Sequence, residues 1–240
     1  MSPHLPRPLQ RIAYEEYAEE YLRSLPLEHF MEATAQATQR AITLTSLALL
    51  TARRPDVHVF NELLVQYPRR GQRRPGQVVP DNMVVVSDQP IRASSSFNTP
   101  LESAKPFWML EYVSKYNKRK DYEDSFRKYE RDLKVPYYLV FYPDAQELTL
   151  FRHNKRKYVT MKPNAEGRYP IPELDLEVGL LDGWVRFWYQ GELLPLPADL
   201  QHNLDQGQRR VDELLRRTKQ QEAALRAAEE ENARLRARLE

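Results

Sequence analysis

Two acidic residues, Asp81 and Glu111, stand where carboxylates could act together on a substrate. Asp81 precedes the apolar run at 82–87, and Glu111 is set into the apolar stretch at 107–114. Burying a carboxylate costs free energy unless a partner or a metal compensates it. If both stretches are neighbouring strands, the two acids can hold Mg²⁺ beside a phosphodiester bond and assist its hydrolysis. The alternative is that Pro80-Asp81 only starts a turn and that Glu111 faces solvent.

The elements around these acids predict an α/β domain. Residues 28–53 have helical apolar spacing and end before Pro55, and residues 119–134 carry a second apolar stripe. Strands are predicted at 57–68, 82–87, 107–114, 136–143 and 147–154, with further strand-like pieces at 176–197. Because hairpins join some strands and a helix joins others, we expect a mixed β-sheet flanked by helices.

A longer pattern connects these elements. It comprises Pro80-Asp81, Glu111-Tyr112-Val113-Ser114, Asp121 with Tyr129 eight residues on, and Val135-Pro136-Tyr137-Tyr138. In this pattern the chain resembles the Uma-type family of restriction-endonuclease-like proteins, within the PD-(D/E)XK nuclease superfamily. The resemblance extends more loosely upstream through the first helix and downstream to about residue 197. It implies a restriction-endonuclease-like core at 27–200 and an endonuclease that hydrolyses DNA, with Mg²⁺ or Mn²⁺ held by Asp81 and Glu111.

The lysine of this superfamily is missing from both places where it is expected. Two residues after the glutamate stands Val113, and four residues after the aspartate that leads the helix stands Ser125. Lys128 is the preferred replacement, because it lies about 60° around the helix from Ser125 and away from the apolar stripe. It would orient the attacking water or neutralise the transition state. Lys115 is the second candidate, and the third possibility is that no lysine acts.

Three further side chains are candidates for the same site. Glu32 and Gln36 lie one turn apart on the first predicted helix, and Glu62 lies within the predicted strand 57–68. The ordinary alternative for such residues is a solvated surface position.

Basic residues cluster although the net charge is only +2. Such clusters could follow a phosphate backbone. The candidates for binding nucleic acid are Arg69, Arg70, Lys118, Arg119 and Lys120. The alternative is that they are solvated loop charges that discourage strand pairing.

The C-terminal residues 201–240 have a different composition, rich in Glu, Arg, Gln, Ala and Leu. A heptad pattern with Leu204, Val211 and Leu225 at equivalent positions predicts a coiled-coil-like helix and a homodimer through 204–239. The alternative is a single charged helix. Residues 1–26 are interpreted as an N-terminal extension.

Composition excludes several classes of protein. The chain has no cysteine and five histidines without zinc-site spacing. It has no apolar run near the roughly eighteen residues of a membrane span and no secretory h-region, so we expect a cytoplasmic protein that does not enter the membrane.

A catalytically impaired nuclease fold, acting as a nucleic-acid-binding or protein-interaction module, is the alternative function. An oligomeric scaffold without a nucleic-acid role is a third.

Overall fold

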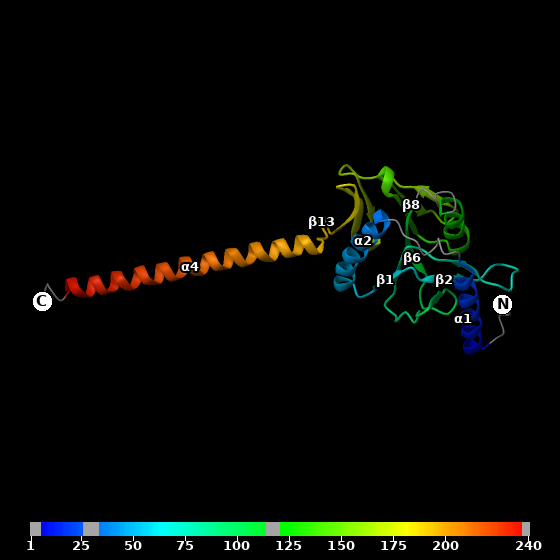
Figure 1. Cartoon of the computed structure of the whole chain (residues 1–240), viewed down its shortest axis with the longest axis horizontal. Coiled ribbons are helices and arrows are strands. Elements are labelled where there is room, and N and C mark those ends of the chain that lie inside the picture. The colour runs from blue at the N-terminus through cyan, green and yellow to red at the C-terminus, as the bar shows by residue number, and fades with distance from the viewer. Residues whose placement is uncertain (1–5, 26–33, 114–120, 237–240) are drawn as a thin grey trace. The chain divides into compact units, whose positions relative to one another are not determined.

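The structure is a computed structural model that describes residues 6–25, 34–113 and 121–236. The chain divides into two compact units, Met1–Leu194 and Pro195–Glu240. The first unit contains mixed sheets flanked by helices, and the described part of the second consists mainly of one long helix (Figure 1). The predicted α/β class and the long C-terminal helix are thereby confirmed.

A six-stranded sheet forms the centre of the first unit, in the order β1-β4-β6-β7-β8-β9. Its strands are β1 (Val57–Asn61), β4 (Asn82–Val86), β6 (Pro106–Tyr112), β7 (Tyr137–Tyr142), β8 (Glu147–His153) and β9 (Tyr158–Thr160). Strands β6 and β7 run parallel, while the other neighbours are antiparallel. The parallel step needs a crossover, and the chain between β6 and β7 contains π-helical segments at Asp121–Ser125 and Lys128–Leu133.

Two smaller sheets accompany the central one. Strands β10 (Arg168–Ile171), β11 (Leu176–Leu181), β12 (Trp184–Tyr189) and β13 (Glu192–Leu193) form an antiparallel meander. Strands β2 (Leu64–Tyr67), β3 (Gly76–Val78) and β5 (Ser96–Asn98) form a three-stranded sheet. The predicted single strand over 57–68 is wrong, because Glu62 has a left-handed φ of 48° that ends β1 and sends β2 into another sheet.

Side-chain alternation gives the central sheet two apolar faces. On one face, Leu47 and Leu50 of α2 (Thr34–Arg53) share a buried cluster with Trp108 and with the four-stranded meander. On the other face, Tyr129 and Leu133 of the crossover share a cluster with the three-stranded sheet. The central sheet is therefore covered on both sides.

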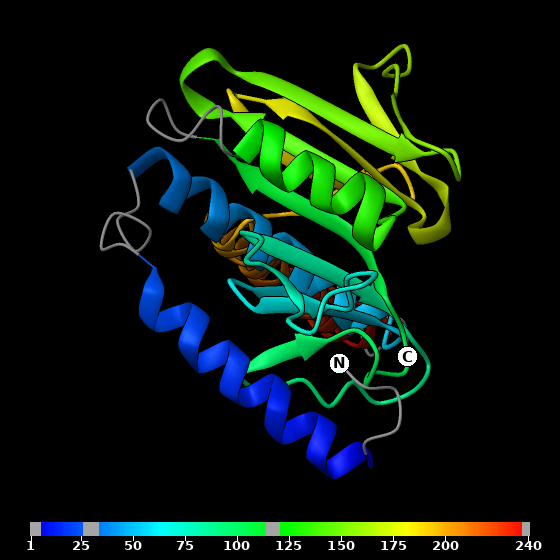
Figure 2. The same cartoon turned by 90° about the vertical axis from the view of Figure 1, so that its right-hand side faces the viewer.

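Helix α1 (Arg7–Ser24) lies within the predicted N-terminal extension and packs against β2 and β5 (Figure 2). Its residues Tyr14 and Ala18 are buried. The side chain of Gln66 donates a hydrogen bond of 2.7 Å to the Tyr14 carbonyl. Helix α1 is thus anchored by both apolar and polar contacts.

Helix α4 (Pro197–Arg236) makes up most of the second unit. Leu204, Val211 and Leu225, which share one heptad position, are at least half exposed in the single chain. No helix in the described part of the chain combines the length and apolarity needed to cross a membrane. The coiled coil and the dimer stay predictions.

Candidate active site

The pairing of β4 with β6 brings Asp81 and Glu111 together. Asn82 lies opposite Leu110 in this antiparallel pair, so Asp81 and Glu111 are the next residues across the two strands. The Asp81 backbone N–H points at Glu111 Oε2 over 3.5 Å. By strand alternation both acids belong to the face on which the crossover packs. The strand neighbourhood that the predicted acid pair requires is therefore present.

Glu111 is a buried carboxylate, 6% exposed, with a buried hydrogen-bond donor. The Tyr129 hydroxyl donates to Glu111 Oε1 over 2.6 Å. Burial raises the pKa of Tyr129 well above its ordinary value, and the negative charge of Glu111 raises it further. The phenol consequently keeps its proton at neutral pH and stabilises the carboxylate.

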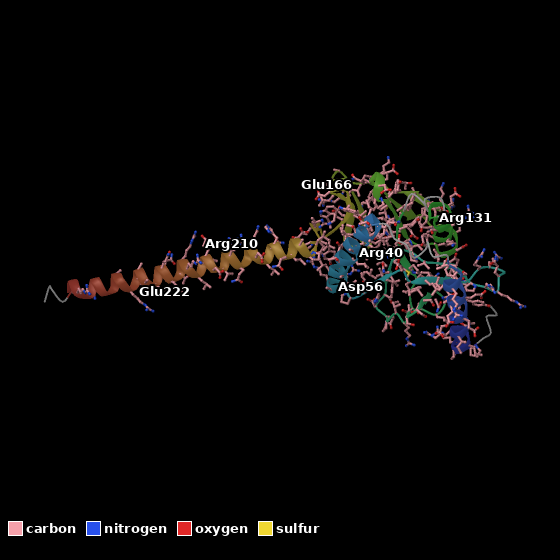
Figure 3. All side chains as sticks on the ribbon, viewed as in Figure 1. Arg40, Asp56, Arg131, Glu166, Arg210 and Glu222 are labelled. Carbon is pink, nitrogen blue, oxygen red and sulfur yellow. The ribbon has the colours of Figure 1, made fainter. Side chains whose placement is uncertain are left out.

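Asp81 is held through both of its carboxylate oxygens. Its Oδ2 accepts a hydrogen bond of 2.6 Å from the Tyr112 backbone N–H, and its Oδ1 accepts one of 3.1 Å from Arg40 Nη2. The same guanidinium donates from Nη1 to Glu62 Oε1 over 2.5 Å. Arg40 projects from α2 in the first unit (Figure 3). Three acids and one arginine therefore meet at this edge of the sheet.

Tyr112 fixes the end of β6 against α2. Its hydroxyl donates to Asn82 Oδ1 and lies 2.7 Å from Thr43 Oγ1, and the side chain is fully buried. Gln36, one of the predicted site candidates, donates from its amide to the Tyr112 carbonyl over 2.5 Å. These bonds determine where the residue after Glu111 stands.

Of the two candidate lysines, only Lys128 lies within the described residues. Lys128 lines a pocket with Tyr67, Asp132 and Arg69, on the side of the three-stranded sheet. Lys115, together with Glu32, Lys118, Arg119 and Lys120, lies outside the described residues. Glu62, an additional candidate for the site, joins the acidic cluster through its ion pair with Arg40.

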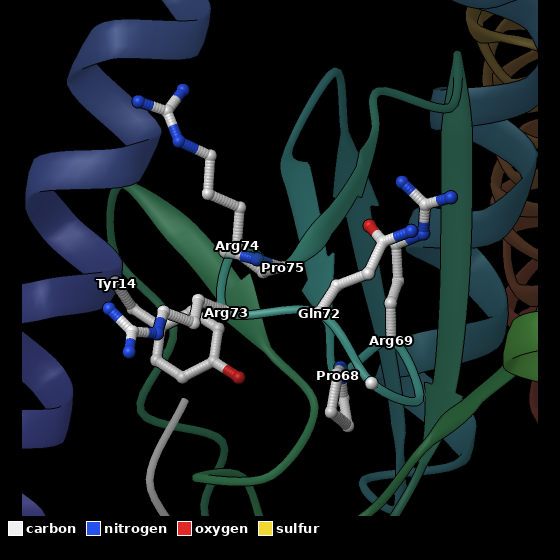
Figure 4. A pocket seen from close by; sticks show the side chains of 8 residues that line it. Tyr14, Pro68, Arg69, Gln72, Arg73, Arg74 and Pro75 are labelled. Atoms are coloured by element: carbon white, nitrogen blue, oxygen red, sulfur yellow. The ribbon is translucent and has the colours of Figure 1, made fainter.

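Arg69 and Arg70 are exposed in the loop that joins β2 to β3. With Arg73, Arg74 and Tyr14, Arg69 lines a basic pocket over this loop (Figure 4). Arg74 pairs with Glu20 of α1 over 2.9 Å. The loop therefore presents several guanidinium groups to solvent.

The donor set of Asp81 and Glu111 fits a divalent cation. Mg²⁺ is commonly bound through one or two carboxylates, with water and substrate phosphates completing its shell. Across residues 6–25, 34–113 and 121–236, no group of three or more acids and histidines is arranged as a metal site. The fit therefore rests on two carboxylates, one of which also pairs with Arg40.

Sequence reasoning did not identify two contributors to this site. Arg40 lies four residues after Gln36 and three before Thr43, so one face of α2 carries all three, and this spacing could have revealed it. Tyr129 belongs to the family-like pattern, but its hydrogen bond to Glu111 follows only from the packing of the crossover on the sheet.

Comparisons with known proteins identify the family of the chain. No curated protein matches the chain. Among solved structures, it is similar to the crystal structure of a "putative nuclease belonging to DUF820" from Anabaena variabilis, with 14% identity and a TM-score of 0.45, over 60% of this chain and 75% of that one. The model of a family named Uma2, described as "Putative restriction endonuclease", matches residues 13–182. Because this match spans well over half of the sequence, the chain belongs to the Uma2 family.

Proposed function

We propose that this chain is a metal-dependent endonuclease that hydrolyses phosphodiester bonds of DNA. The observation that carries the proposal is the meeting of Asp81 and Glu111 across β4 and β6. Membership of a family whose description is "Putative restriction endonuclease" supports the same activity.

In the proposed site, Asp81 and Glu111 would hold Mg²⁺ or Mn²⁺. Such an ion, when bound, supplies a more acidic water and screens the charge of the phosphate. Tyr129 and the Tyr112 backbone N–H keep the two carboxylates in fixed orientations by donating hydrogen bonds of 2.6 Å each. Preorganised carboxylates lose little entropy when a substrate arrives, which favours reaction.

Lys128 is proposed to orient the attacking water or to neutralise developing charge. Its side chain lines a pocket with Tyr67 and Asp132. Its four flexible methylene groups would let the ammonium group move between this pocket and the two acids. A Lys128→Met variant with unchanged cleavage would leave Lys115 or a mechanism without lysine.

The test of the activity is cleavage of supercoiled plasmid DNA by purified protein with Mg²⁺ or Mn²⁺. Asp81→Asn and Glu111→Gln are each expected to lower the rate by at least about a hundredfold, because each removes a charged ligand. Asp88→Asn and Glu147→Gln, at exposed acids elsewhere, are the matched controls. Cleavage that survives in both site variants would refute the assignment.

Arg69 and Arg70 are proposed to contact the DNA backbone, together with Lys118, Arg119 and Lys120. Replacing Arg69 and Arg70 by glutamine is expected to weaken DNA binding at every sequence alike and to reduce its salt dependence. Fluorescence anisotropy over a range of salt concentrations measures both.

A homodimer through 204–239 would offer two such sites, and sedimentation of the full chain and of residues 1–194 tests it.

A second function is favoured by the pairing of Arg40 with Asp81. An arginine on a ligand oxygen opposes metal binding, as would be expected of a catalytically impaired protein that binds nucleic acid or a partner. Salt-dependent DNA binding without cleavage, in protein that calorimetry shows not to bind Mg²⁺ or Mn²⁺, would select this alternative.

A further inference from the structure

Arg40 is built into the acidic cluster rather than into the solvated surface. Its side chain is 15% exposed and is held at two points, by Glu62 at 2.5 Å and by Asp81 at 3.1 Å. A guanidinium carries several donors in one plane, so it can keep one partner while it changes another.

The backbone of Glu62 holds this acid beside Asp81. Its φ of 48° lies in the left-handed region, which is uncommon for a residue other than glycine. The Glu62 N–H donates to the Asp81 carbonyl over 3.2 Å, so the backbone of Glu62 is fixed to the acid with which it shares Arg40.

Glu62 and Asp81, the two partners of Arg40, differ in their exposure to solvent. The Glu62 side chain is about half exposed (52%), whereas that of Asp81 is 23% exposed and lies beside Glu111. A divalent cation is attracted most strongly to the pair of neighbouring acids, which leaves Glu62 free to retain the arginine.

Arg40 and a divalent cation compete for the same carboxylate. Asp81 Oδ2 accepts a hydrogen bond from the Tyr112 N–H, and Oδ1 accepts one from Arg40. A cation held by Asp81 would repel the guanidinium charge and weaken the pairing of Arg40 Nη2 with this carboxylate. Release of Nη2 would leave a donor group beside the bound metal, and a phosphate oxygen is an anionic acceptor that suits it.

We propose that Arg40 exchanges between Asp81 and a phosphate of the substrate backbone. Without a divalent cation, Arg40 pairs with Asp81; with the cation on Asp81, Nη2 binds a phosphate oxygen while Nη1 stays on Glu62. This inference rests on the proposed nuclease function. It supplies a positive charge at the reacting phosphate in a chain that has Val113 and Ser125 where its superfamily has lysine.

The first measurement is calorimetric binding of Mn²⁺ to the full chain without DNA. Arg40→Gln is expected to bind Mn²⁺ at least about tenfold more tightly than the wild type, because the competing charge is gone. Arg40→Lys keeps the charge and should stay near the wild type. The control is Arg54→Gln, which removes a similarly exposed arginine from its pair with Asp56 and should leave Mn²⁺ affinity unchanged.

The second measurement is anisotropy of a short fluorescent DNA duplex with Ca²⁺, which takes oxygen ligands as Mg²⁺ does. Arg40→Gln is expected to bind the duplex more weakly, with a salt slope reduced by about one unit, as for loss of one phosphate contact. Arg40→Lys should fall between. Tighter metal binding combined with weaker DNA binding distinguishes exchange from a structural role, which would weaken both.

The outcomes separate the inference from the proposed function. Equal Mn²⁺ affinity in the wild type and Arg40→Gln, or unchanged DNA affinity, would overturn the exchange while cleavage still supports the nuclease. Failure of every variant to bind Mn²⁺ would overturn both. Circular dichroism and thermal melting of each variant verify that it is folded.

Discussion

Removal of the Tyr129 hydroxyl tests how the buried Glu111 is stabilised. Tyr129 is fully buried, Glu111 is 6% exposed, and 2.6 Å separates the hydroxyl from Oε1. A hydrogen bond to a charged group contributes about 1.5–3 kcal/mol, so Tyr129→Phe should lower the free energy of unfolding by that amount. For a unit of this size, the corresponding fall in Tm is about 3–12 °C. Urea denaturation and thermal melting at neutral pH measure the two quantities.

A matched control and a double-mutant cycle identify the cause. Tyr158 is also buried, but its hydroxyl donates to a neutral acceptor, the Val135 carbonyl, over 3.0 Å. Tyr158→Phe should therefore cost only about 0.5–1.5 kcal/mol. Combined with Glu111→Gln, which removes the charge but keeps an acceptor, Tyr129→Phe should cost about the same smaller amount. An equal loss with and without the Glu111 charge would refute the charge-assisted bond.

Three further predictions concern stability. Burial raises the pKa of Tyr112 above its ordinary value. The resulting contribution to stability is fully present below about pH 10, the ordinary tyrosine pKa, and is lost as pH rises toward the folded-state pKa. Tyr112→Phe should flatten this alkaline decline in the urea midpoint, and an unchanged decline would contradict the prediction. The hydrogen bond from Arg54 lowers the pKa of Asp56, so this pair contributes stability above the ordinary aspartate pKa and loses it as pH falls through the folded-state pKa. Asp56→Asn should lower the free energy of unfolding by about 0.2–1 kcal/mol at pH 7 and by less at pH 3. An equal loss at both pH values would refute the prediction. A Cβ added at Gly76 would overlap the Tyr67 ring, so Gly76→Ala should cost about 1–3 kcal/mol in urea denaturation, and a neutral effect would show that the ring moves freely.

Much of the fold could be predicted because it depends on local patterns. The apolar runs gave strands β4, β6, β7 and β8 within one or two residues, and the hairpin and helix connections indicated a mixed sheet. The division of 57–68 into β1 and β2 could not be predicted, since the left-handed turn falls on Glu62, a residue type without preference for that conformation.

The acids of the candidate site were also visible in the sequence. Both acids could be identified from local sequence signals. Pro80-Asp81 is a turn motif directly before an apolar run, and Glu111 is a charged residue within an apolar run, where burial requires a partner. Their convergence depended on one condition, that β4 and β6 are neighbours, and the register of the sheet meets it.

The partners of these acids were decided by the tertiary structure. Arg40 precedes Asp81 by forty-one residues, and Tyr129 follows Glu111 by eighteen. The spacing of Arg40 from Gln36 places it on one face of α2 but does not indicate its partner, because an ion pair across such a separation exists only after α2 has packed on the sheet. The sequence by itself thus determined which side chains could carry the chemistry, through patterns a few residues long. Only the tertiary structure decided which cation and which hydroxyl meet them, because the free energy of those contacts comes from burial that the folded sheet creates.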